Sequence, residues 1–363
     1  MKNTFGNSLK VTIFGESHGE YIGAVIDGIS PGITFDREFI RKQLSKRRPV
    51  SEISTSRVEP DDFIIASGVF DGKTTGTPLA ILIPNKDTKS KDYSKTRNLA
   101  RPGHADYTAF AKYHGYEDYR GGGHFSGRIT AAVVAAGAVL LNALNNKGIY
   151  IGTHIKSIAD VSDRNFDGIF EDIKALEDKN FAVLDSGKEK QMKDVILAAK
   201  EDGDSVGGVL ETAVWGMPAG VGEPFFDSLE SMLSHAMFSI PAIKGVEFGS
   251  GFELCKMRGS QANDEFFMAG DMPATSTNNS GGINGGISNG MPIIFRTAVR
   301  PTPTIFKEQH TVDFINGQDA VINMQGRHDP CIVHRAGIVQ TCMSALTVAD
   351  MLLTRFGTDF LGE

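Results

Sequence analysis

The sequence predicts one domain of mixed α and β structure with a layer of helices in its interior. Two segments carry this prediction, because Arg128–Asn145 and Arg335–Arg355 are apolar on nearly every side at helical spacing. Such helices must be covered by other elements. The chain has 363 residues, of which 40% are apolar and 22% charged, and no Pro/Ser/Gly linker or block of charge divides it. We therefore expect residues 1–363 to form a single domain.

Segments rich in β-branched residues alternate with helical segments along the chain. The expected strands are Leu9–Phe14, Gly23–Asp27, Asp62–Phe70, Pro78–Ile83, Tyr150–Ile158, Val206–Trp215 and Pro292–Val299. Apolar residues recur at helical spacing in three further segments, Asp36–Lys46, Glu189–Lys200 and Ser228–Phe238. The polar stretch Asn85–Asn98 and the stretch Gly270–Gly290 are expected to be long irregular loops, which in compact domains are often functional.

Composition argues against several classes of protein. Lys plus Arg is 37 and Asp plus Glu is 44, and the formal net charge of −7 is unlike that of a typical nucleic-acid binder. Three cysteines without CxxC spacing suit a reducing compartment and favour neither a disulfide scaffold nor a metal cluster. The N-terminus lacks the pattern of a signal peptide, and the longest apolar run, Ala131–Leu141, is shorter than a membrane span. We expect a cytoplasmic protein that binds neither nucleic acid nor membrane.

The first candidate for chemistry is the turn Phe14–Gly19 (FGESHG), which directly follows an expected strand. Glycines at both sides of the turn let the backbone bend sharply, which would present Ser17 and His18 at the end of the strand. A tight turn with a surface histidine explains the same residues. The spacing does not match the GxSxG nucleophile elbow.

The second candidate is the segment Arg101–Thr108 (RPGHADYT), where a Pro-Gly turn brings Arg101 and His104 close together. Arginine can grip a carboxylate or phosphate with two hydrogen bonds, and histidine can transfer a proton near neutral pH. A helix N-cap at Asp106 with incidental neighbours is the alternative.

Two further segments stand immediately before the apolar helices. Tyr119–Arg128 (YRGGGHFSGR) places three glycines at a helix N-terminus, where outward N–H groups can accommodate an anion or a cofactor, although it matches neither a P-loop nor GxGxxG. Gly326–Cys331 (GRHDPC), followed by Arg335, gathers many ionisable side chains, for which an internal Arg–Asp ion pair is the alternative.

Two other segments have ordinary explanations. Lys46–Pro49 (KRRP) is typical of a basic helix end that complements the macrodipole. Gly281–Gly290 (GGINGGISNG) would let a flat or phosphorylated ligand approach the backbone, and equally suits a bulged hairpin.

Taken together, these motifs resemble those of the chorismate synthase family over essentially the whole chain. The matching segments are FGESHG at 14–19, RRP at 47–49, SGVFDGKTTGTP at 67–78, RPGHADYT at 101–108, RGGG at 120–123, DSVGG at 204–208, KGVEFG at 244–249, GGISNG at 285–290, RPTPTI at 300–305 and GRHDPC at 326–331. Each is modest alone, but coincidence does not explain their number and order.

The resemblance implies an α+β fold, a β-α-β sandwich whose antiparallel sheets enclose helices, assembled as a homotetramer. It implies a lyase of the shikimate pathway and aromatic amino acid biosynthesis. The reaction would be anti-1,4-elimination of phosphate from 5-enolpyruvylshikimate 3-phosphate to give chorismate, using reduced FMN without net redox change. Flavin chemistry of this kind belongs to the cofactor, while the protein supplies geometry and electrostatics.

The resemblance also implies roles for individual residues. His104 would be the acid for the departing phosphate, His18 would supply a proton to the reduced flavin, and Asp329 would lie close to flavin N5. The substrate would be held by arginines, namely Arg47, Arg57, Arg101, Arg128 and Arg327. The FMN contacts would be His124, Phe125, Ser126, Pro241, Ala242, Gly285, Arg300, Pro301, Thr302, Pro303, Thr304 and Arg327.

The sequence departs from the family pattern in a few places. The usual RSSARET after the three glycines is HFSGRIT at 124–130, so that an arginine, a serine and an acid are replaced by His124, Phe125 and Ile129. The usual lysine before Pro-Thr is Arg300, and the segment after Arg47 is shortened, which leaves Arg57 as the nearest counterpart of a second arginine.

Three other hypotheses make different demands on the sequence. A flavin reductase activity would coexist with the lyase, but without a nicotinamide fingerprint we expect an external flavin reductant. A non-catalytic flavin-binding scaffold would have lost acid–base residues, whereas His18 and His104 are present. A metal hydrolase would need ligand spacing such as HExxH, and we expect no metal.

Overall fold

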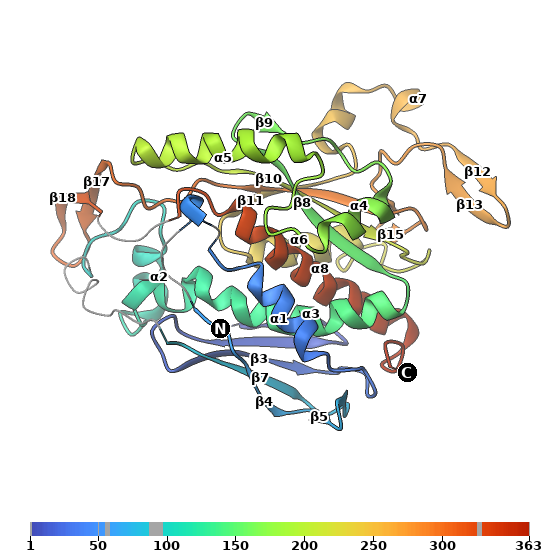
Figure 1. The fold of residues 1–363 in the computed structure, drawn as a ribbon, viewed down its shortest axis with the longest axis horizontal. Helices are drawn as coiled ribbons and strands as arrows, with labels where there is room; N and C mark the ends of the chain where they lie inside the picture. Colours follow the sequence, from blue (N-terminus) through green and yellow to red (C-terminus); the bar gives the residue numbers. More distant parts are fainter. Residues whose placement is uncertain (1, 50, 55–58, 87–96, 325–328, 363) are drawn as a thin grey trace.

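A computed structural model of the chain describes residues 2–49, 51–54, 59–86, 97–324 and 329–362, and shows two antiparallel sheets with helices between them (Figure 1). The first sheet has the order β1-β2-β3-β7-β4, with strands Thr4–Phe5, Lys10–Gly15, Tyr21–Asp27, Leu79–Pro84 and Ile64–Ser67. The second has the order β11-β16-β10-β8-β9, with strands Ile243–Phe248, Ile293–Val299, Gly208–Trp215, Tyr150–Ile158 and Val161–Ser162.

Four two-stranded hairpins, eight α-helices and several short 3-10 turns complete the described part of the chain. The hairpins are β5–β6 (Val69–Phe70, Lys73–Thr74), β12–β13 (Phe266–Ala269, Met272–Thr275), β14–β15 (Ile283–Asn284, Ile287–Ser288) and β17–β18 (Glu308–Asp313, Gln318–Asn323). The helices are α1 (Arg37–Ser45), α2 (Asp106–Tyr113), α3 (Thr130–Asn146), α4 (Ile169–Leu176), α5 (Ser186–Glu201), α6 (Leu229–Ser239), α7 (Gly259–Ala262) and α8 (Val333–Phe356).

The layers follow from the burial pattern of the strands and helices. β7 alternates buried and half-buried residues, so that Leu79, Ile81 and Ile83 face the interior, as expected for a strand with one face on the core. α3 packs on β3 and β7 of the first sheet, and α8 packs on β8 and β10 of the second. The helical layer predicted from two apolar segments is therefore confirmed, and so is the α+β class.

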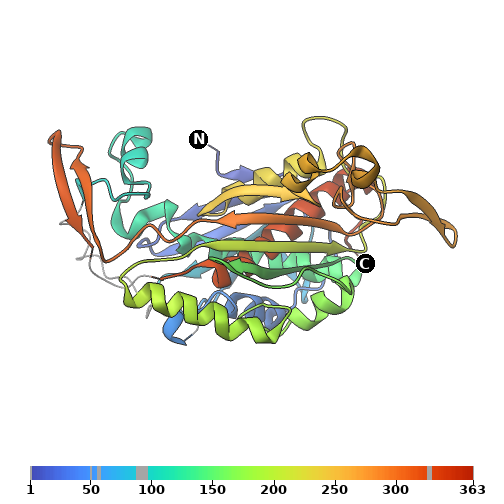
Figure 2. The same ribbon diagram turned by 90° about the horizontal axis from the view of Figure 1, so that it is seen from above.

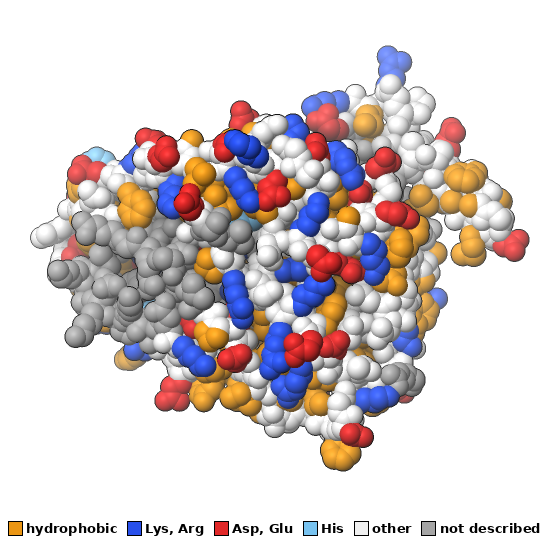
Figure 3. Space-filling model, in the orientation of Figure 1, with side chains coloured by type: hydrophobic (Ala, Val, Ile, Leu, Met, Phe, Trp, Pro, Cys, Tyr) orange, Lys and Arg blue, Asp and Glu red, His pale blue; other side chains and the backbone are white. Residues whose placement is uncertain are grey.

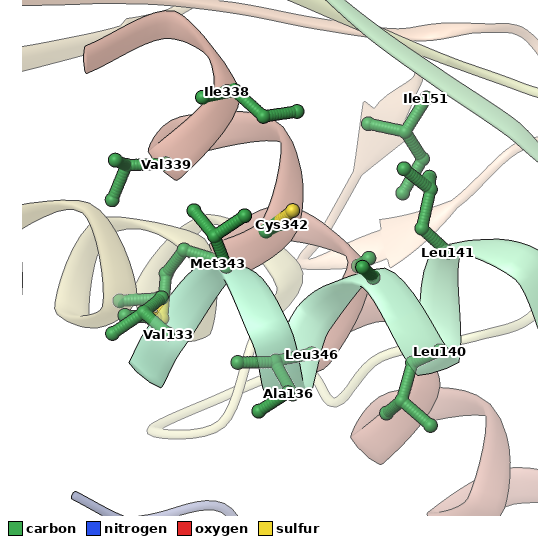
Figure 4. Packing of buried hydrophobic residues seen from close by; sticks show 14 of the residues in the cluster. Val133, Ala136, Leu140, Leu141, Ile151, Ile338, Val339, Cys342, Met343 and Leu346 are labelled. Carbon is green, nitrogen blue, oxygen red and sulfur yellow. The ribbon is translucent and has the colours of Figure 1, made fainter. Parts of the chain in front are cut away.

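The two central helices approach each other closely at one glycine. A Cβ atom built on Gly137 of α3 would lie 2.4 Å from the carbonyl oxygen of Cys342 in α8, so any side chain there would push the helices apart. Val133, Ala136, Met343 and Leu346 fill the space around this contact (Figure 4). Small and aliphatic residues thus let α3 and α8 pack closely in one hydrophobic core.

Two buried polar side chains of α8, Gln340 and Asp350, are hydrogen-bonded inside the core. Gln340 donates to Thr212 of β10 at 2.8 Å and accepts from Thr297 of β16 at 2.5 Å. Asp350 accepts the backbone N–H groups of Asn7, Ser8 and Leu9, which fastens the N-terminal segment to the far end of the helix. Such pairing is required because an unpaired buried polar group would be costly.

Both central helices are long and apolar enough to cross a membrane by length and composition. In the structure, 89% of the apolar window of the helical segment Gly127–Asn146 and 100% of that of α8 are buried inside the protein. Burial of this kind is the property of core helices. Cys331 and Cys342 lie in the same interior, where burial raises the pKa of both thiols to about 12, and all three cysteines are free.

A charged cluster that the sequence did not reveal lies inside the second sheet. His154 of β8 is fully buried, with Nδ1 3.2 Å from Asp163 and Nε2 3.0 Å from Glu211 of β10. Burial by itself would lower the pKa of His154, but the hydrogen bonds to the two carboxylates outweigh it and raise that pKa above its usual value. Burial alone would raise the pKa of Asp163, but hydrogen bonds from His154 and from two backbone N–H groups outweigh it and lower that pKa to about 2.

We expect this cluster to make thermal stability depend on pH. A raised histidine pKa stabilises the folded state fully below about pH 6.5, the ordinary value in an unfolded chain, and this stabilisation is lost as pH rises through the folded value. The Tm of the wild type should therefore fall more steeply above pH 6.5 than that of Glu211→Gln, because the variant lacks one charged partner of His154. Glu308→Gln, on exposed β17, is the control. Parallel Tm-against-pH curves for all three proteins would contradict this account.

The expected elements mostly occur, with shifted ends and several additions. All seven expected strands and all five expected helices are present, although Asp62–Phe70 divides into β4 and β5. The prediction of an irregular Gly270–Gly290 is wrong in part, since it contains β13 and the hairpin β14–β15. Gly285 and Gly286 form the two-residue turn of that hairpin with φ of 60° and 86°, values that glycine adopts without strain. The expected Asn85–Asn98 loop lies largely outside the described residues.

Two hairpins project from opposite ends of the long axis, β17–β18 at one and β12–β13 at the other (Figure 1 and Figure 2). The β12–β13 hairpin exposes large apolar side chains, with Phe266 and Met268 both 63% exposed and Met272 64% exposed. Figure 3 shows them as an apolar projection beyond a face of mixed charge. An isolated two-stranded hairpin is marginally stable in water, so this surface suits a contact with another chain.

Candidate active site

A cavity of about 320 Å³ opens where one end of the helical layer meets the loops. The first turns of α3 and α8 line it, together with the residues just after α1. N-termini of helices carry partial positive charge and unpaired N–H groups, and therefore favour anions. Four arginines (Arg47, Arg48, Arg128 and Arg335) and three carboxylates (Glu59, Asp61 and Asp329) contribute to the lining.

Eight of the residues expected from sequence reasoning line this cavity although they come from distant segments. They are Arg47, His104, Ser126, Arg128, Pro241, Thr302, Thr304 and Asp329. Arg47 follows α1, His104 precedes α2, and Arg128 lies in a 3-10 turn, Gly127–Ile129, that leads into α3. Their meeting depends on the packing of α1, α3 and α8, because no two of these helices are neighbours in sequence.

The carboxylate of Asp61 holds both Arg47 and Arg128, one at each of its oxygens. Asp61 accepts from Nη1 of Arg47 at 3.2 Å through Oδ2, and from Nη1 of Arg128 through Oδ1. Arg47 also donates to Thr130 Oγ1 at 3.2 Å and to the Gly127 carbonyl at 3.1 Å. Arg47 stands at the end of α1, as the helix-end interpretation required, but it is only 6% exposed and its guanidinium is held at the cavity.

Arg128 is joined to the turn that carries His18 through Asn85. The Arg128 Nε donates to Asn85 Oδ1 at 2.9 Å, and Asn85 Nδ2 donates to the carbonyls of Glu16 at 3.0 Å and Gly19 at 2.8 Å. Asn85 therefore fixes the position of the FGESHG turn relative to the cavity. Sequence reasoning placed it in a loop and gave it no role.

His18 lies beside the three-glycine segment, outside the cavity lining. It is 9% exposed, and a Cβ on Gly121 would lie 2.1 Å from its ring, so only glycine leaves room for this imidazole. The Ser17 N–H donates to the Gly123 carbonyl at 3.0 Å, and His124 Nδ1 lies 2.8 Å from the Gly15 carbonyl. The alternative of a surface histidine is therefore wrong.

His104 and Asp329 face the cavity with defined partners. His104 Nε2 lies 2.5 Å from the hydroxyl of Thr304, which brings the loop after β16 against the turn before α2. Asp329 accepts from Arg335 Nη1 at 2.6 Å, and the Arg335 Nε donates to the Arg47 carbonyl at 2.7 Å. An internal Arg–Asp ion pair, the alternative considered for GRHDPC, exists here and belongs to the cavity wall.

Arg101 does not line the cavity. Its guanidinium makes a two-point contact with Asp106, at 2.8 and 2.7 Å, while its carbonyl accepts from the His104 N–H at 3.0 Å. Asp106 is the first residue of α2 and makes no N-cap bond, so the N-cap alternative is wrong. The pair instead holds the turn on which His104 stands.

The other residues expected to touch a flavin differ in their distance from the cavity. The hairpin that holds Gly285 packs against the N-terminal end of α6, whereas Pro241 of the lining follows the C-terminal end of that helix, so Gly285 lies away from the cavity. Arg300 donates to the Gly103 carbonyl and Pro303 lies against Gly103, so the 300–304 segment packs on the His104 turn. Phe125 is 41% exposed, and Gly285 is in the β14–β15 turn. Two more residues expected to touch the flavin, Ala242 and Pro301, do not line the cavity. The Ala242 carbonyl accepts a hydrogen bond from the Arg300 N–H. Arg57 and Arg327 lie outside the described residues.

The sequence model for "Chorismate synthase" matches residues 9–353. The chain belongs to the chorismate synthase family. Chorismate synthases of Pyrococcus abyssi and Methanosarcina mazei are 46% and 44% identical to it, over 96% and 97% of this chain and 97% and 96% of their own lengths. A structure described as "Crystal Structure of Chorismate Synthase" superposes with a TM-score of 0.77 and 32% identity, covering 98% of this chain and 94% of that one.

Membership of the chorismate synthase family confirms the resemblance inferred from the motifs. It makes the chain a lyase of the shikimate pathway, and the sandwich architecture agrees with the solved relative. Among the described residues, no group of three or more His, Cys, Asp or Glu side chains is placed to hold a metal ion.

Proposed function

We propose that the cavity binds 5-enolpyruvylshikimate 3-phosphate beside reduced FMN and eliminates phosphate to give chorismate. The observation that carries the proposal is the convergence of Arg47, Arg128, His104 and Asp329 on one cavity at two helix N-termini. A substrate with two carboxylates and a phosphate needs several cationic groups and N–H donors in one place. A cavity of about 320 Å³ with a few convergent polar groups has the size of a small-metabolite site.

The residues beside the cavity fit a flavin phosphate or ring edge. Arg300 Nε and Thr302 Oγ1 are buried without a hydrogen-bond partner in the described part of the chain, and both belong to the segment assigned to FMN by resemblance. Buried donors of this kind call for a polar partner. We assign the flavin to this side of the cavity, against Ser126, Pro241 and the 300–304 segment.

In the proposed reaction, a C–O bond to phosphate at C3 breaks and a proton leaves C6, so that a new double bond forms. His104 donates a proton or hydrogen bond to the departing phosphate oxygen, which leaves more readily when its charge is neutralised. Asp329, held by Arg335, would lie close to flavin N5 and aid removal of the C6 proton, and His18 would supply a proton to the reduced flavin ring. The chemistry that reduced FMN would supply when bound is donation of electron density to the substrate without net redox change.

We expect the purified protein, kept anaerobic with dithionite-reduced FMN, to release one phosphate for each chorismate formed. Phosphate and chorismate would be measured in the same sample, and oxidised FMN without reductant is the control that should give no turnover. Failure of turnover with reduced flavin would favour a non-catalytic flavin-binding scaffold.

The proposed function also includes a flavin reductant, an oligomeric assembly and a cellular compartment. We assign reduction of the flavin to an external reductant, a homotetramer as the working assembly, and the cytoplasm as the compartment. The exposed apolar side chains of β12–β13 support association with further copies of the chain. The mass in solution tests this part, and a monomer at working concentration would contradict it.

A further inference from the structure

Asp61 occupies an unusual position among the residues of the cavity. It is 4% exposed, and its backbone φ of 54° lies in the left-handed region, which Asp and Asn adopt more readily than most residues. It stands in the loop before β4, whereas its two partners come from the end of α1 and the turn before α3. One carboxylate therefore joins three segments of the chain.

Each oxygen of this carboxylate fixes one guanidinium. Arg128 is held at three points, by Asp61, by Asn85 Oδ1 at 2.9 Å and by the Pro84 carbonyl at 3.3 Å. Arg47 is likewise held by Asp61 and by two acceptors in the 127–130 turn. A planar group with three fixed contacts has its orientation set before a ligand arrives, so little side-chain freedom remains to be lost on binding.

A buried carboxylate next to an anion site has two opposite effects. Its negative charge repels an anionic substrate, which would weaken binding. It also lets two positively charged guanidiniums stay side by side in a buried place where they would otherwise repel each other. Both guanidiniums contact Asp61 directly, at less than 3.3 Å, so we expect the second effect to be larger.

We propose that Asp61 is a positioning residue that sets Arg47 and Arg128 in the geometry that receives the anionic groups of the substrate. This inference rests on the proposed function, because it assumes that these two arginines bind the substrate. It assigns Asp61 no contact with the substrate and no proton transfer. The carboxylate acts through the arginines.

The test is Asp61→Asn, compared with Asp62→Asn as a matched control. Asparagine keeps the size and suits a positive φ, but it replaces one of the two accepting oxygens with an NH₂ donor, so one of the two arginines loses its acceptor. Asp62 has a 67% exposed side chain, 3.8 Å from Lys86, so the control removes the same charge one residue away. Titration calorimetry with 5-enolpyruvylshikimate 3-phosphate should show about 10- to 100-fold weaker binding for Asp61→Asn, the scale expected for misplaced contact groups. Asp62→Asn should stay within about twofold of the wild type, since exposed ion pairs contribute little.

Binding of oxidised FMN separates positioning from general damage. The Kd for FMN should be unchanged in Asp61→Asn, whereas a distorted fold would weaken both ligands. Asp61→Glu keeps both oxygens on a longer arm, and its substrate Kd should lie between those of the wild type and Asp61→Asn. This second variant carries the test if the asparagine variant does not fold.

Two outcomes would overturn the inference while leaving the proposed function intact. In one, the wild type binds the substrate and Asp61→Asn binds it equally or more tightly, which would mean that repulsion dominates. In the other, Asp61→Asn weakens the binding of oxidised FMN by the same factor as that of the substrate, which would mean that it damages the fold and does not act through the arginines. A wild type that fails to bind the substrate would instead contradict the proposed function itself.

Discussion

The His104→Ala variant is expected to lose about 100- to 10,000-fold in kcat, the usual contribution of a positioned general acid, while its substrate Kd changes only a few-fold. His104 faces the cavity and contacts Thr304, but the arginines of the lining provide most of the anion binding in our proposal. Loss of the imidazole therefore removes proton donation to the leaving phosphate, whereas the arginines still bind the substrate. Single-turnover phosphate release and calorimetric binding would measure the two quantities separately.

His310→Ala is the matched control, because this imidazole is exposed on β17. Its kcat should equal that of the wild type. If His104→Ala and His18→Ala both kept near-normal turnover, the roles assigned to the two histidines would be wrong.

The Arg128→Met variant is expected to lose about 1–3 kcal/mol of unfolding free energy and measurable substrate binding, because buried acceptors are left without their donor although Asp61 keeps Arg47 as a partner. The side chains of Arg128 and Asp61 are only 4% and 3% exposed, and Asn85 and the Pro84 carbonyl would also lose a donor. Methionine fills a similar volume, so the effect reports the loss of charge and hydrogen bonds more than a cavity. Denaturant unfolding monitored by circular dichroism would give the free energy.

Arg41→Met provides the comparison for stability. Arg41 pairs with Glu38 on α1, where the side chains are 53% and 80% exposed, and such pairs are worth less than about 1 kcal/mol. An Arg128→Met protein as stable as Arg41→Met would show that the buried network contributes nothing to folding.

The central fold could be predicted from the sequence because its signals are local. Arg128–Asn145 and Arg335–Arg355 are apolar on all sides, and such helices can only be stable when other layers cover them. The strands Tyr150–Ile158 and Pro292–Val299 were found through their β-branched residues. The hairpins β12–β13 and β17–β18 were missed, since short segments with exposed residues carry weak periodicity. The helix α4 was missed although it has a buried face, because it is only 8 residues long.

The site was predictable in part, and for a different reason. Arg47, Arg128, His104 and Asp329 stand in segments with recognisable motifs, and all four line one cavity. Asn85 and Asp61 were missed because a single polar residue in a loop gives no sign of what its side chain will contact. The His154 cluster was missed for the same reason, since Asp163 and Glu211 are ordinary charged residues until the second sheet forms.

The sequence alone determined the class of fold, the helical core and the membership of one enzyme family, because periodicity and ordered motifs are properties of neighbouring residues. Only the tertiary structure decided which guanidiniums face the cavity. Arg128 and Arg101 are the same residue type in equally suggestive motifs, yet Arg128 lines the cavity and Arg101 is held by Asp106 five residues away. The direction of a long charged side chain depends on which carboxylate lies within reach, and that is fixed only when distant segments pack together.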